Sequence, residues 1–224
     1  NVYMFLYGAT GLLIPASLST ALYMSEGGFI FENDGVVSLD YMALFTSPYA
    51  WSVVGLAIVS VLFISASFLT FYAARANDSE ALRLVRKYAL FWSTPTIIAA
   101  LTTFIALGEH NERHYNNMMD LWWVFGLSVG FFIIAIALIY AKKYYGWAFI
   151  SVMLQFFFAF FGYGASHLPY ILEPYITIYE SATHESTGIA LIIAFIGGLF
   201  LLIPSLILLM KLFLFDADYV KGKK

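Results

Sequence analysis

The chain has 224 residues, of which 62% are hydrophobic and only 11% are charged, and its net charge is −3 at pH 7. Soluble domains carry about 25% charged residues, so this composition excludes a water-soluble enzyme, a disordered tail and a nucleic-acid-binding domain with a clustered basic surface. The chain has no cysteine, which also excludes disulfides, thiol catalysis, thiolate zinc sites and iron–sulfur clusters.

Six apolar segments reach the roughly 20 residues that a helix needs to cross a bilayer. They are continuously apolar, whereas the strands of a membrane barrel alternate between apolar and polar residues. We therefore predict an all-α, polytopic transmembrane helix bundle in one domain, 1–224. Its six spans are expected at 2–24, 51–74, 89–107, 121–141, 147–166 and 187–215. The first apolar run begins at Asn1 without the charged segment of a signal peptide, so we interpret the chain as part of a longer protein.

Two segments that connect the predicted spans have recognisable composition patterns. Residues 25–49 form a long acidic loop. Residues 77–88 carry the apolar Leu82, Leu84 and Val85 between cations, a pattern that fits a short helix on the membrane surface. A plain charged connector explains the same residues equally well.

The four histidines, His110, His114, His167 and His184, fall at span ends or in loops rather than at membrane depth. The spacing of His110 and His114 would allow one helix face to hold a metal, but the polar residues around them favour a solvated loop. No acid or base lies near the middle of a span, where such a residue would be diagnostic of ion coupling. We therefore expect no catalytic, cofactor-binding or metal-binding residue in this chain.

Three positions within the spans are candidates for helix packing. Gly126 and Gly130 form a GxxxG pattern, which allows a neighbouring helix to approach closely. Gln155 places an amide in an apolar span, where it needs a hydrogen-bonding partner. An interhelical hydrogen bond is favoured over a ligand role for Gln155.

The loop at 167–186 is long but not polar, and prolines interrupt it. Exposure of so much apolar surface to water is unfavourable. We therefore expect Pro169, Tyr170, Pro174 and Tyr175 to belong to a structural element that either caps the bundle or lies against a partner subunit, with burial on this chain's own helices as the simpler alternative.

With six spans, the charges separate onto the two sides of the membrane. All cations except Arg113 fall on one side, and most acidic residues fall on the other. The positive-inside rule makes the basic side cytoplasmic, so the C-terminus is expected in the cytoplasm. The cations on this side are Arg75, Arg83, Arg86, Lys87, Lys142, Lys143, Lys211, Lys221, Lys223 and Lys224.

Several separated segments resemble subunit II of the bacterial cytochrome bd-type quinol oxidases. The strongest is GYGASHLPY at 162–170, continued by PYITIY at 174–179. Others are SEGGF at 25–29, WSTPT at 92–96, HN and HY at 110–111 and 114–115, YGWAF at 145–149, and the tail from 202–205 to 219–223. The resemblance covers essentially the whole chain.

This resemblance implies a multi-pass subunit in the bacterial cytoplasmic membrane, of which the chain is the C-terminal two-thirds. In the family, roughly three further helices come first and hold most of the acidic residues proposed for proton movement, so none of those roles transfers to this chain. The haem-bearing subunit I would be the partner and would bind two b-type haems and one d-type haem. The complex would oxidise a quinol and reduce oxygen to water.

Other partners expected from the family and the composition are a small single-span subunit and membrane lipid, but no nucleic acid. Two alternatives remain open from the residues alone. A transporter or permease component would need ionisable or ligand-binding groups at the midplane. A structural membrane scaffold would need no redox partner.

Overall fold

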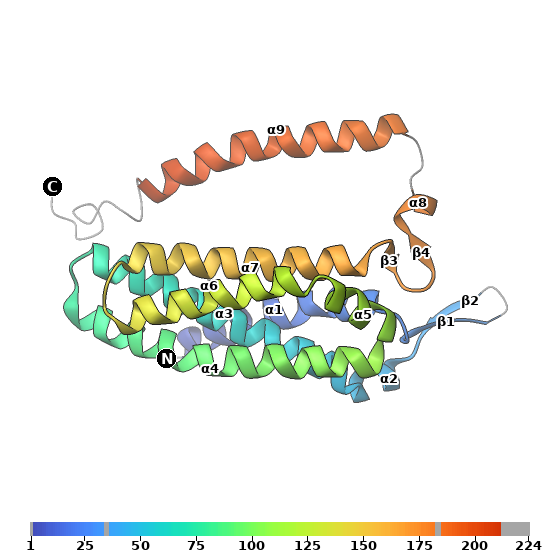
Figure 1. The fold of residues 1–224 in the computed structure, drawn as a ribbon, viewed down its shortest axis with the longest axis horizontal. Helices are drawn as coiled ribbons and strands as arrows, with labels where there is room; N and C mark the ends of the chain where they lie inside the picture. Colours follow the sequence, from blue (N-terminus) through green and yellow to red (C-terminus); the bar gives the residue numbers. More distant parts are fainter. Residues whose placement is uncertain (1, 34–35, 182–184, 212–224) are drawn as a thin grey trace.

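The computed structural model describes residues 2–33, 36–181 and 185–211, which form a bundle of long helices (Figure 1). Within these residues, six helices are long and apolar enough to cross a membrane. They are α1 (Val2–Ser25), α3 (Pro48–Arg75), α4 (Ser79–His110), α6 (Trp122–Tyr140), α7 (Tyr145–His167) and α9 (Glu185–Leu209). The predicted all-α bundle with six spans is confirmed, while the end of the sixth predicted span, 212–215, lies outside the described residues.

Short elements gather at one end of the bundle, here called the hairpin end (Figure 1). They include two helices, α2 (Tyr41–Thr46) and α5 (Glu112–Asp120), and the one-turn α8 (Ile178–Ser181). Two antiparallel hairpins lie at the same end, β1 (Ile30–Asn33) with β2 (Val36–Leu39), and β3 (Tyr170–Leu172) with β4 (Ile176–Thr177). The opposite end is here called the basic end, because α3 ends there at Arg75 and α4 begins there at Ser79. Arg83, Arg86 and Lys87 lie in the first turns of α4, and Lys142 and Lys143 lie between α6 and α7.

Polar caps define where several helices begin. The Asp40 carboxylate accepts a 2.9 Å hydrogen bond from the Ala43 amide, and Asp78 accepts one of 3.0 Å from the Ala81 amide. Ser47 caps α3 in the same way, and Pro48 follows it at the first helical position. Side-chain oxygens at these positions satisfy amides that have no partner within the helix, so α2, α3 and α4 each begin at a defined residue.

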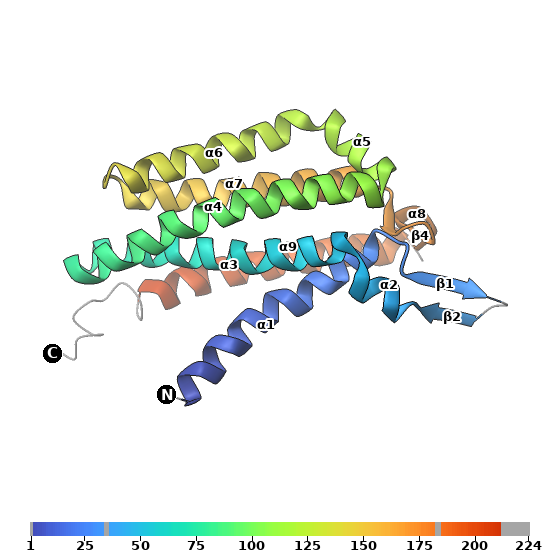
Figure 2. The same ribbon diagram turned by 90° about the horizontal axis from the view of Figure 1, so that it is seen from below.

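Two antiparallel helix pairs, α3 with α4 and α6 with α7, make the most extensive contacts, and α1 packs against α3 (Figure 2). Polar side chains connect helices directly. Thr96 donates to the Val59 carbonyl at 3.3 Å, and Ser128 donates to the Gln155 carbonyl at 2.9 Å. The largest buried apolar cluster lies toward the hairpin end and comprises Tyr23, Phe29, Leu44, Tyr49, Ala50, Val53, Leu107 and Met118. The chain is therefore packed most completely where its short elements meet.

Helix α9 runs alongside the bundle, apart from α7 (Figure 1). None of the most apolar stretch of this helix is buried within the described part of the chain. Its large apolar side chains, among them Phe195, Phe200 and Leu201, are exposed. In a membrane protein such a surface contacts lipid or further protein.

The interpretation of 77–88 as a separate surface helix or a plain connector is wrong. The chain turns only at 76–78, where Asn77 has a positive φ of 54°, and α4 then runs without interruption from Ser79. Asp78 caps the start of this helix, and residues 79–88 contain no proline or glycine that would end it. They therefore form the first turns of the membrane-spanning helix.

Candidate functional site

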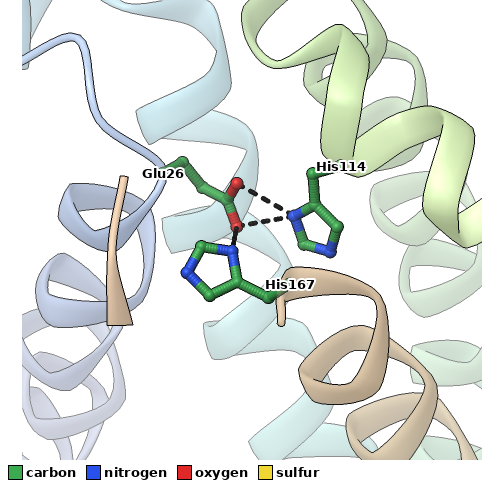
Figure 3. A group of neighbouring side chains, drawn as sticks. All are labelled: Glu26, His114 and His167. Carbon is green, nitrogen blue, oxygen red and sulfur yellow. Dashed lines mark hydrogen bonds and ion pairs between the residues drawn. The ribbon is translucent and has the colours of Figure 1, made fainter. Parts of the chain in front are cut away.

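Three ionisable side chains meet at the hairpin end, and all are buried (Figure 3). Glu26 directly follows α1, His114 lies in α5, and His167 is the last residue of α7. His114 has no exposed surface, and Glu26 and His167 are 4% and 8% exposed. Charged groups are almost never buried this completely unless they are paired. The hydrogen-bond and ion-pair partners of these side chains therefore determine which of them is ionised.

Glu26 and His114 form a close pair. The His114 Nδ1 lies 2.9 Å from both carboxylate oxygens of Glu26. On the other edge of the ring, Nε2 lies 2.8 Å from the Ser166 hydroxyl and 3.2 Å from the Tyr163 carbonyl. A carbonyl only accepts hydrogen bonds, which favours a proton on Nε2.

The Ser166 hydroxyl supports the same assignment. It lies 2.8 Å from the carbonyls of Gly162 and Tyr163, to which it donates its hydrogen. Its oxygen is then free to accept from His114. Both nitrogens of His114 therefore face groups that accept hydrogen bonds, and Nδ1 lies directly against the Glu26 carboxylate.

His167 contributes differently. Its Nδ1 lies 3.4 Å from a Glu26 oxygen, close enough for electrostatic attraction but without hydrogen-bond geometry. Neither of its ring nitrogens has a hydrogen-bond partner among the described residues, although both are buried. The ring packs on its neighbours, with its centroid 5.1 Å from that of His114. Buried polar atoms without partners cost about 1–3 kcal/mol each.

Two further groups hydrogen-bond to the Glu26 carboxylate. The Tyr163 hydroxyl donates a short hydrogen bond to one oxygen, and Asn111 donates to the other at 3.0 Å. Burial raises the pKa of the Glu26 carboxyl, but the hydrogen bonds from His114 and Tyr163 and the nearby His167 ring outweigh burial and lower this pKa to about 2. Glu26 is therefore ionised at neutral pH.

Asn111 and the two glycines after Glu26 position His114 and Glu26 next to each other. Asn111 ends α4 and caps α5, with its side chain accepting a 3.0 Å hydrogen bond from the His114 amide. Gly27 and Gly28 both have φ of +79°, a conformation that side chains with a Cβ rarely adopt. They turn the chain sharply after α1, so that Glu26 points into the cluster.

A second ion pair borders the cluster. Arg113 binds Glu173 through two hydrogen bonds of 2.8 and 2.5 Å. Asn111 donates to the same carboxylate at 2.7 Å while also bonding Glu26, so it connects the two networks. Burial raises the pKa of Glu173, but the bonds from Arg113 and Asn111 lower it by more, and it lies below the ordinary value. The charge of Arg113 is thereby balanced next to the buried site.

Residues 1–213 match the sequence profile of the cytochrome bd terminal oxidase subunit II family. The chain belongs to this family. It is 31% identical to a relative named as a putative cytochrome bd menaquinol oxidase subunit II of Bacillus subtilis, with 98% of this chain aligned. It also resembles a chain in the structure of bd oxidase from Geobacillus thermodenitrificans, at 53% identity with a TM-score of 0.81 over 96% of this chain. In both comparisons it spans 66% of the other protein's length.

For this subunit II chain, the structure places the predicted loop residues in the β3–β4 hairpin. Tyr170 begins β3, and its ring lies under the Arg113 guanidinium at 4.7 Å. The Pro169 carbonyl accepts from the Ile178 amide at 2.9 Å, and the Tyr175 hydroxyl donates to the Ile30 carbonyl at 2.8 Å. Pro174 follows Glu173 in the turn. The hairpin therefore lies against this chain's own α1 end and first hairpin, while a role toward a partner stays a prediction.

The candidates for packing within the spans are placed as follows. Gln155 is buried, but its Oε1 has no hydrogen-bond partner among the described residues, and it is the backbone carbonyl that accepts from Ser128. A Cβ added to Gly126 or Gly130 would meet no atom within 4 Å. Close approach at the GxxxG pattern therefore involves no helix of the described chain, and its use against another subunit stays a prediction.

The sequence interpretation missed the cluster itself. His110 and His114 do not share a helix face, because Asn111 separates α4 from α5. The His110 ring stacks between Phe29 and Tyr49, and its Nε2 lies 3.1 Å from the Gly27 carbonyl. The expected solvated loop is wrong for His114, which is fully buried. His184 lies outside the described residues. The signal available in the sequence was an Asn before a charged segment, which is typical of a helix start.

Proposed function

We propose that this chain is the subunit II component of a membrane complex that oxidises a quinol and reduces oxygen to water. The observation that carries the proposal is the family match over residues 1–213, together with the 53% identity to a chain of a bd oxidase structure. The curated relative is named as a menaquinol oxidase subunit, which makes menaquinol the first substrate to test. These similarities favour an oxidase subunit over the transporter and scaffold alternatives.

The haems belong, in this proposal, to a partner subunit I. A haem at membrane depth needs axial ligands such as histidine. His110, His114 and His167 all lie at the hairpin end, engaged with Gly27, Glu26 and each other. This chain then supplies a packing surface for the haem-bearing subunit rather than ligands.

The outward surfaces of α6 and α9 support such a partner role. Gly126 and Gly130 leave open space on α6, and small residues at this spacing allow a helix from another subunit to approach. The exposed apolar side chains of α9 need lipid or protein as neighbours. Subunit I, a small single-span subunit and membrane lipid are the proposed occupants of these surfaces.

The proposed location is the bacterial cytoplasmic membrane, with the basic end and the C-terminus in the cytoplasm. The cations of the described chain other than Arg113 gather at or near the basic end, as the positive-inside rule requires for that orientation. The Glu26 cluster then faces the outside.

Co-purification tests the oxidase assignment. The complete subunit, affinity-tagged in its native host, is expected to bring down a second subunit whose reduced-minus-oxidised spectrum shows b- and d-type haem. The preparation is expected to consume oxygen when supplied with menaquinol. A colourless preparation without quinol-dependent oxygen uptake would contradict the proposal.

A separate experiment tests the role of the β3–β4 hairpin toward the partner. Its exposed apolar residues include Ile171 and Ile176, and we expect them to stabilise the outer face of the assembly. Replacing Pro169 and Pro174 with alanine should lower the d-haem absorbance per milligram of membrane protein. Unchanged haem content and assembly would remove this role and leave the hairpin as a cap for this chain alone.

A further inference from the structure

We propose that Glu26, His114 and His167 form a binding site for a divalent transition-metal cation, with zinc as the cation that the donor set fits best. One carboxylate oxygen and one ring nitrogen from each histidine all lie within 4.8 Å of one another (Figure 3). Two imidazoles with one carboxylate are a donor set that proteins use for zinc, with a fourth position left for water. Sequence reasoning expected no metal ligand in this chain.

The spacing of the donor atoms suits a metal. With zinc bonds of about 2.0–2.1 Å in tetrahedral geometry, neighbouring ligand atoms lie about 3.3 Å apart. The Glu26 oxygens lie 2.9 Å from His114 Nδ1, and the nearer one lies 3.4 Å from His167 Nδ1. Only small rotations of these side chains are needed to surround a cation.

His167 provides the second, independent observation. Its ring is buried, yet neither nitrogen has a hydrogen-bond partner among the described residues, and Nδ1 points at the Glu26 carboxylate. The contact between Glu26 and His114 leaves both ring nitrogens of His167 without a hydrogen-bond partner among the described residues. A cation between the three side chains satisfies its Nδ1 by coordination.

The surroundings of His114 are those of a metal-binding histidine. Ligating histidines generally donate their second ring N–H to a carbonyl or another acceptor, which fixes the ring orientation. His114 Nε2 has Ser166 Oγ at 2.8 Å and the Tyr163 carbonyl at 3.2 Å in those positions. A cation bound at Nδ1 would lie between His114 and the Glu26 carboxylate, while Nε2 keeps these two neighbours.

The consequence of such a site is structural. Glu26 follows α1, His114 lies in α5 and His167 ends α7, so one cation would connect three segments that are far apart in the sequence. The site would hold the hairpin end closed, and it is independent of the haem chemistry proposed above.

Metal analysis of the intact complex tests the site directly. The complex is purified without chelators or metal-affinity resin and measured by inductively coupled plasma mass spectrometry. We expect about one zinc per chain in the wild type and in His110→Gln, a control that removes an imidazole at the same end but outside the donor set. His167→Ala and Glu26→Gln should lose this metal.

A second test uses only the wild-type complex, so its outcome does not depend on whether a variant folds. Complex treated with a chelator should regain zinc and thermal stability when ZnCl₂ alone is added. Absence of both effects, or equal metal loss in His110→Gln and His167→Ala, would overturn the proposal.

A cysteine at position 167 gives a spectroscopic test. The chain contains no cysteine, so zinc-edge X-ray absorption of the wild type should show only nitrogen and oxygen ligands from this chain. His167→Cys should add one sulfur at about 2.3 Å. Ser166→Ala, which removes the acceptor behind His114, should weaken zinc binding about 10–100-fold. Zinc without the added sulfur would place the metal elsewhere and refute the assignment.

Discussion

The sharp turn after α1 makes a quantitative prediction for Gly27→Ala. Gly27 has φ of +79°, and a Cβ at this position would overlap the carbonyl oxygen of Glu173 and lie 3.1 Å from its carbonyl carbon. Left-handed backbone costs about 1–2 kcal/mol for a residue with a Cβ. Because the obstacle is backbone, the β3–β4 hairpin must also move.

Movement of the hairpin breaks specific bonds. The Glu173 amide donates to the Ser25 carbonyl at 2.9 Å, and the Glu173 carboxylate binds Arg113. A neutral hydrogen bond contributes about 0.5–1.5 kcal/mol and one to a charged group about 1.5–3 kcal/mol. With the backbone strain, Gly27→Ala should destabilise the hairpin end by about 3–6.5 kcal/mol.

Thermal unfolding of the purified complex in detergent measures this effect against two matched variants. At Gly28, φ is also +79°, but the added Cβ meets only side-chain atoms of His110, at 3.2 and 3.6 Å, so Gly28→Ala should cost about 1–2 kcal/mol. Gly164 lies in α7 with open space around its Cβ position, and Gly164→Ala should be neutral or stabilising by up to about 1 kcal/mol. If Gly27→Ala unfolds at the same temperature as Gly164→Ala, the proposed clash does not govern this turn.

Three other changes have defined outcomes. Glu173→Gln should lower the melting temperature at neutral pH by the equivalent of about 1–3 kcal/mol. The pKa of Glu173 is lowered, so its contribution is present above the ordinary carboxyl range and is lost as the pH falls through the lowered pKa. The difference in melting temperature between wild type and variant should therefore shrink as the pH falls below the ordinary carboxyl range, and a constant difference would contradict the ion pair with Arg113. Ser128→Ala removes a 2.9 Å hydrogen bond to a carbonyl of α7 and should cost about 1 kcal/mol in the same assay; no change would mean that α6 and α7 do not depend on it. Tyr163→Phe removes a donor to the Glu26 carboxylate and should destabilise the complex by about 1–3 kcal/mol at pH 7, and a variant as stable as wild type would show that another donor replaces the phenol.

The spans could be predicted from the sequence because length and hydropathy are local properties. Helices α3 and α6 follow from apolar runs of the right length, with Pro48 opening the first of them. The sequence predicts the third span at 89–107, whereas α4 begins at Ser79. The reason is that charged residues at 79–88 lower the mean hydropathy without lowering helix propensity. Hydropathy marks the part of a helix in the membrane, whereas capping residues such as Asp78 mark where the helix begins.

The Glu26 cluster could not be predicted in the same way, since its members come from three separate segments. His114 and Glu26 are 88 residues apart, and Tyr163 is 137 residues from Glu26. Only the packing of α1, α5 and α7 at one end brings them together. Periodicity within a single helix does not report such contacts, and Asn111 changes the local geometry that the spacing of His110 and His114 suggested.

Helix α1 is held by the described part of this chain only near its end. Its buried residues, Ser19 and Tyr23, lie in its last two turns, and the helix runs away from α3 toward its start (Figure 2). A helix of 24 residues is about 36 Å long, and the large apolar side chains along its first half, among them Tyr3, Phe5 and Leu13, are exposed among the described residues. The Glu26 cluster is thus built next to the part of α1 that this chain itself buries, so its geometry depends on contacts within the chain rather than on what covers the rest of the helix.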